Sequence, residues 1–359
     1  MRNILARDEA LEILGGRSRA SKEMLMAIKH GYSENVTCSR NVFIPLTRVC
    51  RNRCGYCTFK RDANGGSNIM SFEEVMDLVG KAETKGCHEA LLTFGESADS
   101  DTKVRKELER GGYGTMTDLV HDLSLHIAEN SALMVHTNAG LLTKGDLKRL
   151  RDVTASMGIM LESSSERLMG TIAHMDSPGK DPVKRKRMIE DAGRLKIPFT
   201  TGLLIGIGES DEEIYRSLLD LRKIQDRYGH LQELIMQNFV PKPDTPMGRY
   251  KGPSFEKMAS VVTVARMMFP DLAIQLPPNL NKERLSELMS LGIDDLGGIS
   301  PVSIDHVNPE SPWPEEMIKG LGIRERLPVY PKYIDKDYLS EFNYNKALGL
   351  IDDSGYVRK

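Results

Sequence analysis

The chain lacks the features that mark secreted and membrane proteins. No apolar run reaches the roughly 20 residues that a membrane helix needs, and residues 1–7 contain no apolar signal-peptide core. The 49 basic and 51 acidic side chains nearly cancel, to a net charge of −2, which excludes a bulk attraction to nucleic acid or anionic membrane. The five cysteines, an odd number, argue against a disulfide framework. These absences predict a cytoplasmic protein with neither a nucleic-acid nor a membrane partner.

Three of the five cysteines, Cys50, Cys54 and Cys57, lie in one CxxxCxxC segment. This loop supplies three thiolates, whereas a structural zinc site takes four protein ligands. A four-iron cluster held by three cysteines keeps one iron open, and an open position is where a cofactor or substrate binds. The pattern therefore favours a [4Fe-4S] cluster. A structural zinc site is the alternative, and its fourth ligand would be Cys38, Cys87 or His88.

Apolar runs of strand length alternate with longer amphipathic runs along most of the chain. Strands are predicted at residues 41–47, 89–94, 132–136, 154–161, 198–205, 234–239 and 272–276, with a short eighth near Ile293. Helices are predicted at residues 71–86, 115–130, 143–151, 182–195, 210–228, 254–269 and 281–291. Such alternation produces right-handed βαβ units and a parallel sheet. About six to eight units predict an α/β fold that closes, fully or partly, into a (β/α) barrel.

The predicted domain organisation has three parts. Residues 1–35 form an N-terminal helical extension, and residues 36–300 form the barrel core. Residues 301–359, rich in proline and aromatic side chains, form a C-terminal tail that packs on the barrel. In barrels of this kind the ligand site lies at the carboxyl ends of the strands. The cysteine loop follows the first predicted strand directly, so it is expected at that mouth.

Candidate binding residues recur after the later predicted strands. Gly95 admits close backbone approach, and the carboxylate of Glu96 accepts from an ammonium group. Glu162 suits sugar hydroxyls, although its serine-rich surroundings equally suit a helix N-cap. The glycine-rich run 202–209 lacks the GxGxxG register of a dinucleotide-binding turn. In the basic run 184–187, one inward arginine suits a ligand carboxylate, while the other residues suit a solvated face.

Taken in order, these motifs resemble the radical S-adenosylmethionine (SAM) enzymes over about residues 41–276. The resemblance implies a [4Fe-4S] cluster on Cys50, Cys54 and Cys57, whose open iron is chelated by the amino and carboxylate groups of SAM. The other implied SAM contacts are Tyr56, Gly95, Glu96, Glu162, Arg185, Gly206 and Glu209, with Arg187 as a second choice for the arginine. Phe94 and Leu204 depart from the family's usual glycine and isoleucine. The implied chemistry is a 5′-deoxyadenosyl radical that abstracts hydrogen from substrate, so no catalytic acid–base pair is expected.

A closer resemblance, over most of the chain, is to the CofG family of 7,8-didemethyl-8-hydroxy-5-deazariboflavin (FO) synthase. It is carried by residues 42–59, 195–202, 237–239 and 294–302. It implies a carbon–nitrogen lyase of coenzyme F(420) biosynthesis acting on 5-amino-5-(4-hydroxybenzyl)-6-(D-ribitylimino)-5,6-dihydrouracil, a uracil–tyrosine adduct made by a CofH-type partner enzyme. Hydrogen abstraction, ring closure and ammonia loss then yield FO. A reductant such as ferredoxin or flavodoxin is implied as well.

Three polar residues near late strand ends are predicted to face this substrate: Gln237, Asn238 and Asp294. For the two amides, the competing interpretation is that they satisfy backbone groups in the barrel.

Two other classes of function fit parts of the sequence. Another radical SAM reaction, such as the CofH-type step, a tyrosine lyase or a biotin-synthase-like sulfur insertion, shares the cysteine motif. Sulfur insertion needs ligands for a second cluster, and Cys38 and Cys87 are too few for one. A non-catalytic, zinc-stabilised binding protein fits the thiols alone. Iron and sulfide content separates zinc from a cluster, and FO formation separates the radical reactions.

Overall fold

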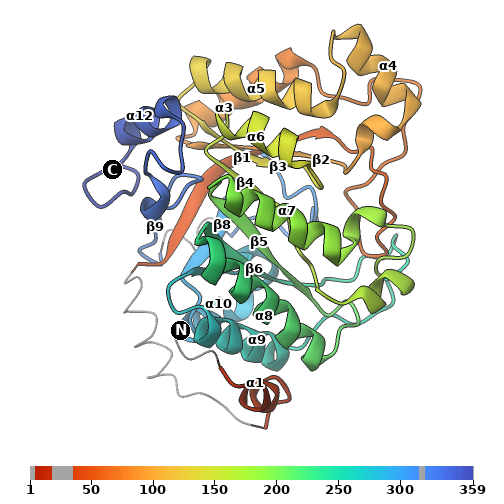
Figure 1. The fold of residues 1–359 in the computed structure, drawn as a ribbon, viewed down its shortest axis with the longest axis vertical. Coiled ribbons are helices and arrows are strands. Elements are labelled where there is room, and N and C mark those ends of the chain that lie inside the picture. The colour runs from red at the N-terminus through yellow and green to blue at the C-terminus, as the bar shows by residue number, and fades with distance from the viewer. Residues whose placement is uncertain (1–4, 18–34, 315–319, 359) are drawn as a thin grey trace.

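The computed structural model describes residues 5–17, 35–314 and 320–358. Eight parallel strands run in the order β2-β3-β4-β5-β6-β7-β8-β1, and pairing of β1 with β2 closes them into a barrel (Figure 1). The predicted α/β barrel is confirmed, in its fully closed form. The strands are β1 Thr37–Thr47, β2 Glu89–Phe94, β3 Met134–Asn138, β4 Ser156–Gly158, β5 Phe199–Ile205, β6 Leu231–Asn238, β7 Ala273–Gln275 and β8 Asp295–Ile299.

Helices surround the barrel on its outer side (Figure 1). They are α1 Arg7–Leu14, α3 Phe72–Thr84, α4 Thr102–Arg110, α5 Met116–Asn130, α6 Lys144–Arg151, α7 Pro182–Arg194, α8 Asp211–Tyr228, α9 Phe255–Met268, α10 Leu285–Ser290 and α12 Glu341–Leu350. Capping boxes start four of them, at Ser71, Thr115, Thr143 and Ser210. The helix predicted at 281–291 is instead a 3-10 turn, η5 Lys282–Arg284, followed by α10.

The fourth strand departs from its prediction in a way that shapes the barrel mouth. β4 has ended by Gly158, whereas the prediction ran to residue 161. Beyond it the chain bends, and Glu162 adopts a left-handed φ of +64° while its backbone bridges to Leu203 of β5. A non-glycine residue in this conformation costs on the order of 1 kcal/mol, and such strain is common at functional sites.

The C-terminal segment closes the opposite, amino-terminal end of the barrel. A short strand, β9 Arg324–Glu325, pairs in parallel with Thr37 and Cys38 at the start of β1. Beyond it, a buried apolar cluster joins the tail to the starts of the barrel strands; it includes Leu327, Val329, Tyr333, Met134, Ala155 and Ala273. The tail thus packs on the barrel, and its helix α12 reaches the end of α5, where Lys346 Nζ donates to the carbonyl oxygen of Ala128 at 2.6 Å.

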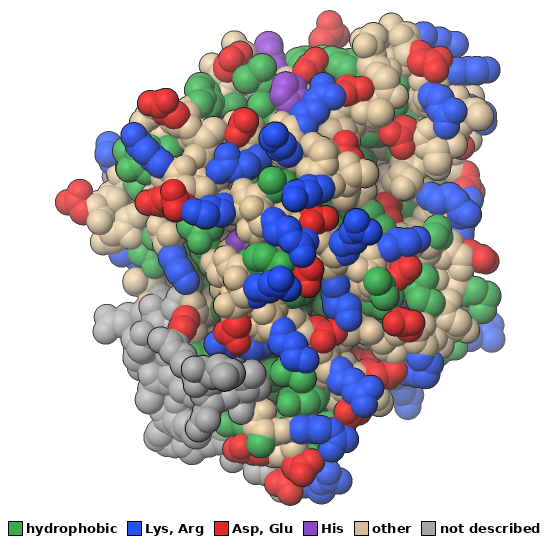
Figure 2. Space-filling view, in the orientation of Figure 1, with side chains coloured by type: hydrophobic (Ala, Val, Ile, Leu, Met, Phe, Trp, Pro, Cys, Tyr) green, Lys and Arg blue, Asp and Glu red, His purple; other side chains and the backbone are tan. Residues whose placement is uncertain are grey.

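At the other terminus, α1 packs against α8 and α9. The remainder of the predicted N-terminal extension, residues 1–4 and 18–34, lies outside the described residues. None of the helices in the described ranges is long and apolar enough to cross a membrane. On the face that carries α6, α7 and α8, basic and acidic side chains are interspersed (Figure 2), in keeping with the near-zero net charge.

Candidate active site

The three motif cysteines line one pocket at the carboxyl end of the barrel, directly after β1. We call it the cysteine pocket. Its other walls come from the segments that follow β2, β3 and β4, and include Glu96, Gly140, Glu162, Lys180 and Arg185. All three thiols are free, and burial raises the pKa of each, that of Cys50 to about 11. The thiols are therefore protonated at neutral pH unless a metal replaces the protons.

Glu96 and Arg185, predicted to bind the two ends of an amino acid, contact each other in this pocket. Arg185 Nη2 donates to Glu96 Oε2 at 2.9 Å, and Arg185 Nε donates to the carbonyl oxygen of Gly179 at 2.6 Å. Arg185 is 3% exposed, whereas Arg187 on the same helix is exposed to solvent. The adjacent carboxylate and guanidinium are complementary to the ammonium and carboxylate of an amino acid.

Two glycines allow close packing in this pocket, one around the Glu96 carboxylate and one against the cysteine loop. A Cβ on Gly179 would lie 1.3 Å from Glu96 Oε1, so no other residue fits there without moving this carboxylate. A Cβ on Gly95 would lie 1.9 Å from the carbonyl oxygen of Val49. Gly95 therefore permits close packing of the β2 end on the cysteine loop, an approach of backbone to backbone.

Glu162 forms a buried ion pair with Lys180. Lys180 Nζ donates to Glu162 Oε1 at 2.5 Å, and the two side chains are 13% and 8% exposed. Burial opposes ionisation of Glu162, but the charges of Lys180 and Arg185 outweigh it and lower the pKa of the carboxyl. Tyr56 lies close by, with its hydroxyl 3.2 Å from His174 Nε2 and its ring centroid 5.9 Å from Lys180 Nζ.

A second cavity, of about 210 Å³, lies inside the barrel. Alternate residues along the strands face it, as expected where side chains point in and out in turn. They include Asn41 and Phe43 of β1, Glu89 and Leu91 of β2, and Glu233, Ile235 and Gln237 of β6. Asn138, Ile159 and Met160 line both this barrel cavity and the cysteine pocket. A group bound among the cysteines would therefore adjoin a molecule held in the barrel.

Known proteins resemble the chain in sequence. The model of the Radical SAM superfamily matches residues 44–221. The 7,8-didemethyl-8-hydroxy-5-deazariboflavin synthase of Methanocaldococcus jannaschii is 47% identical, over 97% of this chain and 99% of its own length. The protein of the same name from Methanothermobacter thermautotrophicus is 53% identical, over 85% and 94%. The chain belongs to this synthase family.

Solved structures with the same fold are more distant in sequence. The FeFe-hydrogenase maturase HydG from Carboxydothermus hydrogenoformans superposes with a TM-score of 0.70 at 18% identity, covering 90% of this chain and 76% of its own. Methylornithine synthase superposes with a TM-score of 0.64 at 18% identity, covering 85% of each chain. At this identity the likeness concerns the fold, which is the radical SAM barrel.

Membership in the synthase family makes the chain a radical SAM enzyme of deazaflavin biosynthesis, and the family uses a [4Fe-4S] cluster and SAM. The cysteine pocket has the chemistry that these groups require. It contains three thiols, the carboxylate of Glu96 beside the guanidinium of Arg185, and a second carboxylate on Glu162, which are the types of group that iron, an amino acid and sugar hydroxyls bind. In a [4Fe-4S] cluster each cysteine binds a different iron, so the three thiols need not converge on one ion. Within the described residues, no three His, Cys, Asp or Glu side chains converge on a single metal ion.

Four residues predicted for the synthase site line neither cavity in the described part of the chain: Gly206, Glu209, Asn238 and Asp294. Glu209 folds back on the turn after β5 and accepts from the backbone nitrogen of Gly206 at 2.6 Å. Asn238 accepts from Asn281 Nδ2 at 2.9 Å. Asp294 is paired with Arg266 at 2.8 Å, on the outer side of the barrel. Of the three predicted substrate contacts, only Gln237 lines the barrel cavity.

Sequence reasoning did not find Lys180, nor the polar residues of the barrel interior other than Gln237. The signal for Lys180 was its place after Pro178 and Gly179, just before the predicted helix at 182–195. That turn carries Lys180 into the cysteine pocket, opposite Glu162.

Proposed function

We propose that this enzyme converts 5-amino-5-(4-hydroxybenzyl)-6-(D-ribitylimino)-5,6-dihydrouracil into FO, by hydrogen abstraction, ring closure and release of ammonia, and that it is therefore a carbon–nitrogen lyase. The observation that carries the proposal is the shared wall of Asn138, Ile159 and Met160 between the cysteine pocket and the barrel cavity. Because the two cavities adjoin at these residues, a substrate in the barrel would lie next to a radical formed beside the cysteines. The names of the relatives give the product.

In this proposal Cys50, Cys54 and Cys57 hold the cluster. Glu96 takes the ammonium of SAM, Arg185 takes its carboxylate, and Glu162 takes the ribose hydroxyls. When bound, the cluster and SAM supply a 5′-deoxyadenosyl radical. The protein itself positions the two ligands and keeps water out, because Glu96, Glu162 and Arg185 are all less than a tenth exposed. Tyr56 packs beside this site through His174 and Lys180.

The proposed partners follow from the reaction. A CofH-type radical SAM enzyme supplies the uracil–tyrosine adduct, and a low-potential reductant such as ferredoxin or flavodoxin supplies the electron. We place the reaction in the cytoplasm, where a reducing environment keeps thiols free. All five cysteines are free in the structure.

The deciding experiment is anaerobic incubation of the reconstituted enzyme with SAM, dithionite and the product of the CofH-type enzyme. Fluorescent FO and one equivalent of ammonia per FO are expected. Deoxyadenosine without FO would leave radical SAM chemistry intact and overturn the proposed substrate. A protein that holds one zinc and no iron would exclude the radical reaction altogether.

A further inference from the structure

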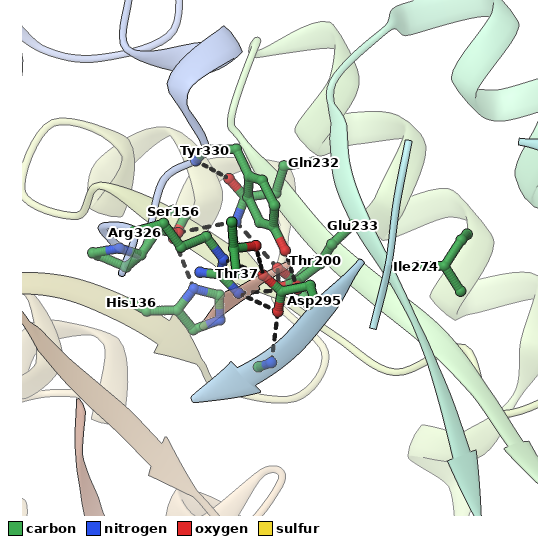
Figure 3. A network of polar contacts seen from close by, with 12 residues as sticks. Thr37, His136, Ser156, Thr200, Gln232, Glu233, Ile274, Asp295, Arg326 and Tyr330 are labelled. Atoms are coloured by element: carbon green, nitrogen blue, oxygen red, sulfur yellow. Dashed lines mark hydrogen bonds and ion pairs between the residues drawn. The ribbon is translucent and has the colours of Figure 1, made fainter. Parts of the chain in front are cut away.

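The amino-terminal end of the barrel cavity is a polar surface fixed from below by the C-terminal tail. We call it the barrel floor and define it by residues that line the cavity there: Asn41, Glu89, His136, Thr200, Glu233 and Arg326. Arg326 Nε donates to Asp295 Oδ2 at 2.7 Å, and Arg326 Nη2 lies 3.2 Å from Glu233 Oε2 (Figure 3). The floor is therefore tied together before any ligand binds.

The carboxylate of Glu233 has its partners within this network. Thr200 Oγ1 donates to Glu233 Oε1 at 2.7 Å, and Tyr330 OH donates to Glu233 Oε2 at 2.8 Å (Figure 3). Arg326 is committed as well, since its Nη1 donates to the carbonyl oxygen of Leu327. Neither group has to leave its present partners for a ligand to enter the cavity.

Asn41, in contrast, has a buried side-chain acceptor without a partner in the described part of the chain. Its side chain is 3% exposed, and its Oδ1 makes no hydrogen bond to the described part of the chain. A buried amide oxygen in this state costs about 1–3 kcal/mol unless a ligand or water donates to it. Asn279, nearer the mouth of the same cavity, has a second such oxygen and is 4% exposed. Two side chains that line the cavity thus carry an amide oxygen without a partner among the described residues, each packed just beneath the cavity surface.

Tandem glycines of β8 leave room for Asn41 and for a second amide beside it. A Cβ on Gly298 would lie 2.1 Å from Asn41 Nδ2, and a Cβ on Gly297 would lie 2.1 Å from Gln275 Nε2. Gly297 also has a φ of +71°, a conformation that favours glycine. The two glycines therefore make room for two carboxamides that line the cavity.

The charge of the floor selects the kind of ligand. Arg326 is the only Lys or Arg among the described lining residues, and it already faces Glu233 and Asp295. Glu89 adds another carboxyl group, whose pKa is raised by burial, and it brings no positive charge. His136 offers no positive charge, because burial lowers its pKa to about 3. A buried anion without a counter-charge is strongly unfavourable, so an anionic ligand group is disfavoured here while neutral hydroxyls are not.

We propose that the barrel floor binds an uncharged polyhydroxy chain of the substrate, with Asn41 as an acceptor, and that it discriminates against the phosphorylated form of that chain. This inference rests on the proposed function, in which the chain is the ribityl group. The apolar residues above the floor, Phe43, Leu91 and Ile235, flank the ring system. The substrate is then held with its ribityl end toward the tail and its rings toward the cysteine pocket.

The test compares three probes on the reconstituted, anaerobic holoenzyme: FO, its 10-methyl analogue without the hydroxyl chain, and FO 5′-phosphate. Their intrinsic fluorescence reports binding. FO is expected to bind about tenfold more tightly than either analogue, which corresponds to one or two hydrogen bonds. Equal affinity for FO and the 10-methyl analogue, equal affinity for FO and its phosphate, or no measurable binding of FO overturns the assignment.

Two variants place the effect at the floor. Asn41→Leu is expected to lower the affinity for FO to that of the 10-methyl analogue. Asn343→Leu is the matched control, because Asn343 is 1% exposed and also has an unpartnered Oδ1 among the described residues, but lies in α12 outside the cavity. Glu89→Gln removes an acidic group from the floor and is expected to bring the affinity for FO 5′-phosphate several-fold closer to that for FO. If Asn41→Leu does not fold, the ratio of the affinities for FO and FO 5′-phosphate in Glu89→Gln still tests the proposal. A ratio equal to that of the wild type overturns the charge argument.

Failure of this inference is distinguishable from failure of the proposed function. An enzyme that forms FO but binds FO and the 10-methyl analogue equally overturns only the floor. An enzyme that prefers the hydroxyl chain but forms no FO from the CofH-type product supports the floor and overturns the proposed reaction.

Discussion

Lys180 Nζ lies 2.5 Å from Glu162 Oε1, and this ion pair is buried between the bend after β4 and the turn before α7. Glu162 is also the residue proposed to receive the ribose of SAM, and it sits in a left-handed conformation. The lysine therefore fixes this carboxylate, which sits at a strained point of the backbone, before any ligand binds. It also keeps the carboxylate ionised.

The first prediction concerns this pair. Lys180→Met leaves the Glu162 carboxylate buried without its cation, and removing one partner of a buried pair costs about 3–5 kcal/mol. We expect a loss in the free energy of unfolding of that order, measured by urea denaturation. Because Glu162→Gln removes the charge that is left unpaired, the double variant should be more stable than Lys180→Met alone.

The matched control for Lys180→Met is Lys81→Met. Lys81 pairs with Asp77 at 2.5 Å, the same distance, but both side chains are more than half exposed. Exposed pairs contribute about 0–1 kcal/mol, so this variant should unfold nearly as the wild type does. A double variant at Glu162 and Lys180 that is less stable than Lys180→Met would contradict the buried-charge explanation.

The barrel was predictable from the sequence because its strands are apolar runs of regular spacing. Helix α4 was missed because only Val104 and Leu108 are buried in it, which is too few to show a helical stripe. Helix α12 was missed for a similar reason, since only Asn343 and Ala347 are buried. Arg185 was chosen over Arg187, but the sequence alone could not show which of the two faces inward.

The substrate-facing residues show where sequence reasoning ends. Gln237 and Asn238 are neighbours in β6, so they point to opposite faces, and a one-residue difference in register exchanges them. Asp294 and Asp295 are also neighbours that point to opposite sides. Asp294 pairs with Arg266 outside the barrel, whereas Asp295 pairs with Arg326 at the barrel floor. Arg326 comes from the tail, far along the chain, and no local pattern links it to the barrel interior.

The second prediction concerns the close approach of Gly179 to Glu96. Gly179→Ala would place a methyl group 1.3 Å from Glu96 Oε1, so the carboxylate must move away from Arg185. The proposed hydrogen bond from the SAM ammonium to Glu96 would then be lost. Loss of a hydrogen bond to a charged group costs about 1.5–3 kcal/mol, so the Kd for SAM should rise at least about tenfold. Equilibrium dialysis with labelled SAM on the reconstituted enzyme measures this. Gly170→Ala, where a Cβ meets nothing within 4 Å, should bind SAM normally.

The third prediction concerns the cysteines. Replacing Cys50, Cys54 or Cys57 with alanine should lower the iron content from about four per chain to less than about one, with loss of the visible absorption of a [4Fe-4S] cluster. Cys38 and Cys87 are buried at the start of β1 and before β2, away from the cysteine pocket. Alanine at either position should leave iron and sulfide unchanged. Iron retained in a Cys54→Ala variant would show that the motif is not the ligand set.

The fourth prediction concerns His136, which is buried in the barrel floor. Ser156 Oγ donates to the carbonyl oxygen of Pro328, so it accepts from His136 Nδ1 at 2.7 Å. Burial, and then the charge of Arg326, lower the pKa of His136 to about 3. Because this folded-state pKa lies below the unfolded value, the neutral ring contributes stability above about pH 6.5, and this contribution is lost as the pH falls toward 3. His136→Asn keeps a donor for Ser156 but does not titrate. Between about pH 6.5 and 5 the wild type should therefore lose roughly 1.5 kcal/mol more of its unfolding free energy than the variant.

Urea denaturation at several pH values measures the difference, with His121→Asn on the outer surface of α5 as the control. If the curves of wild type and His136→Asn stay parallel across this range, His136 does not unfold from a buried neutral state, and the absence of a positive charge from the floor would have to be reconsidered.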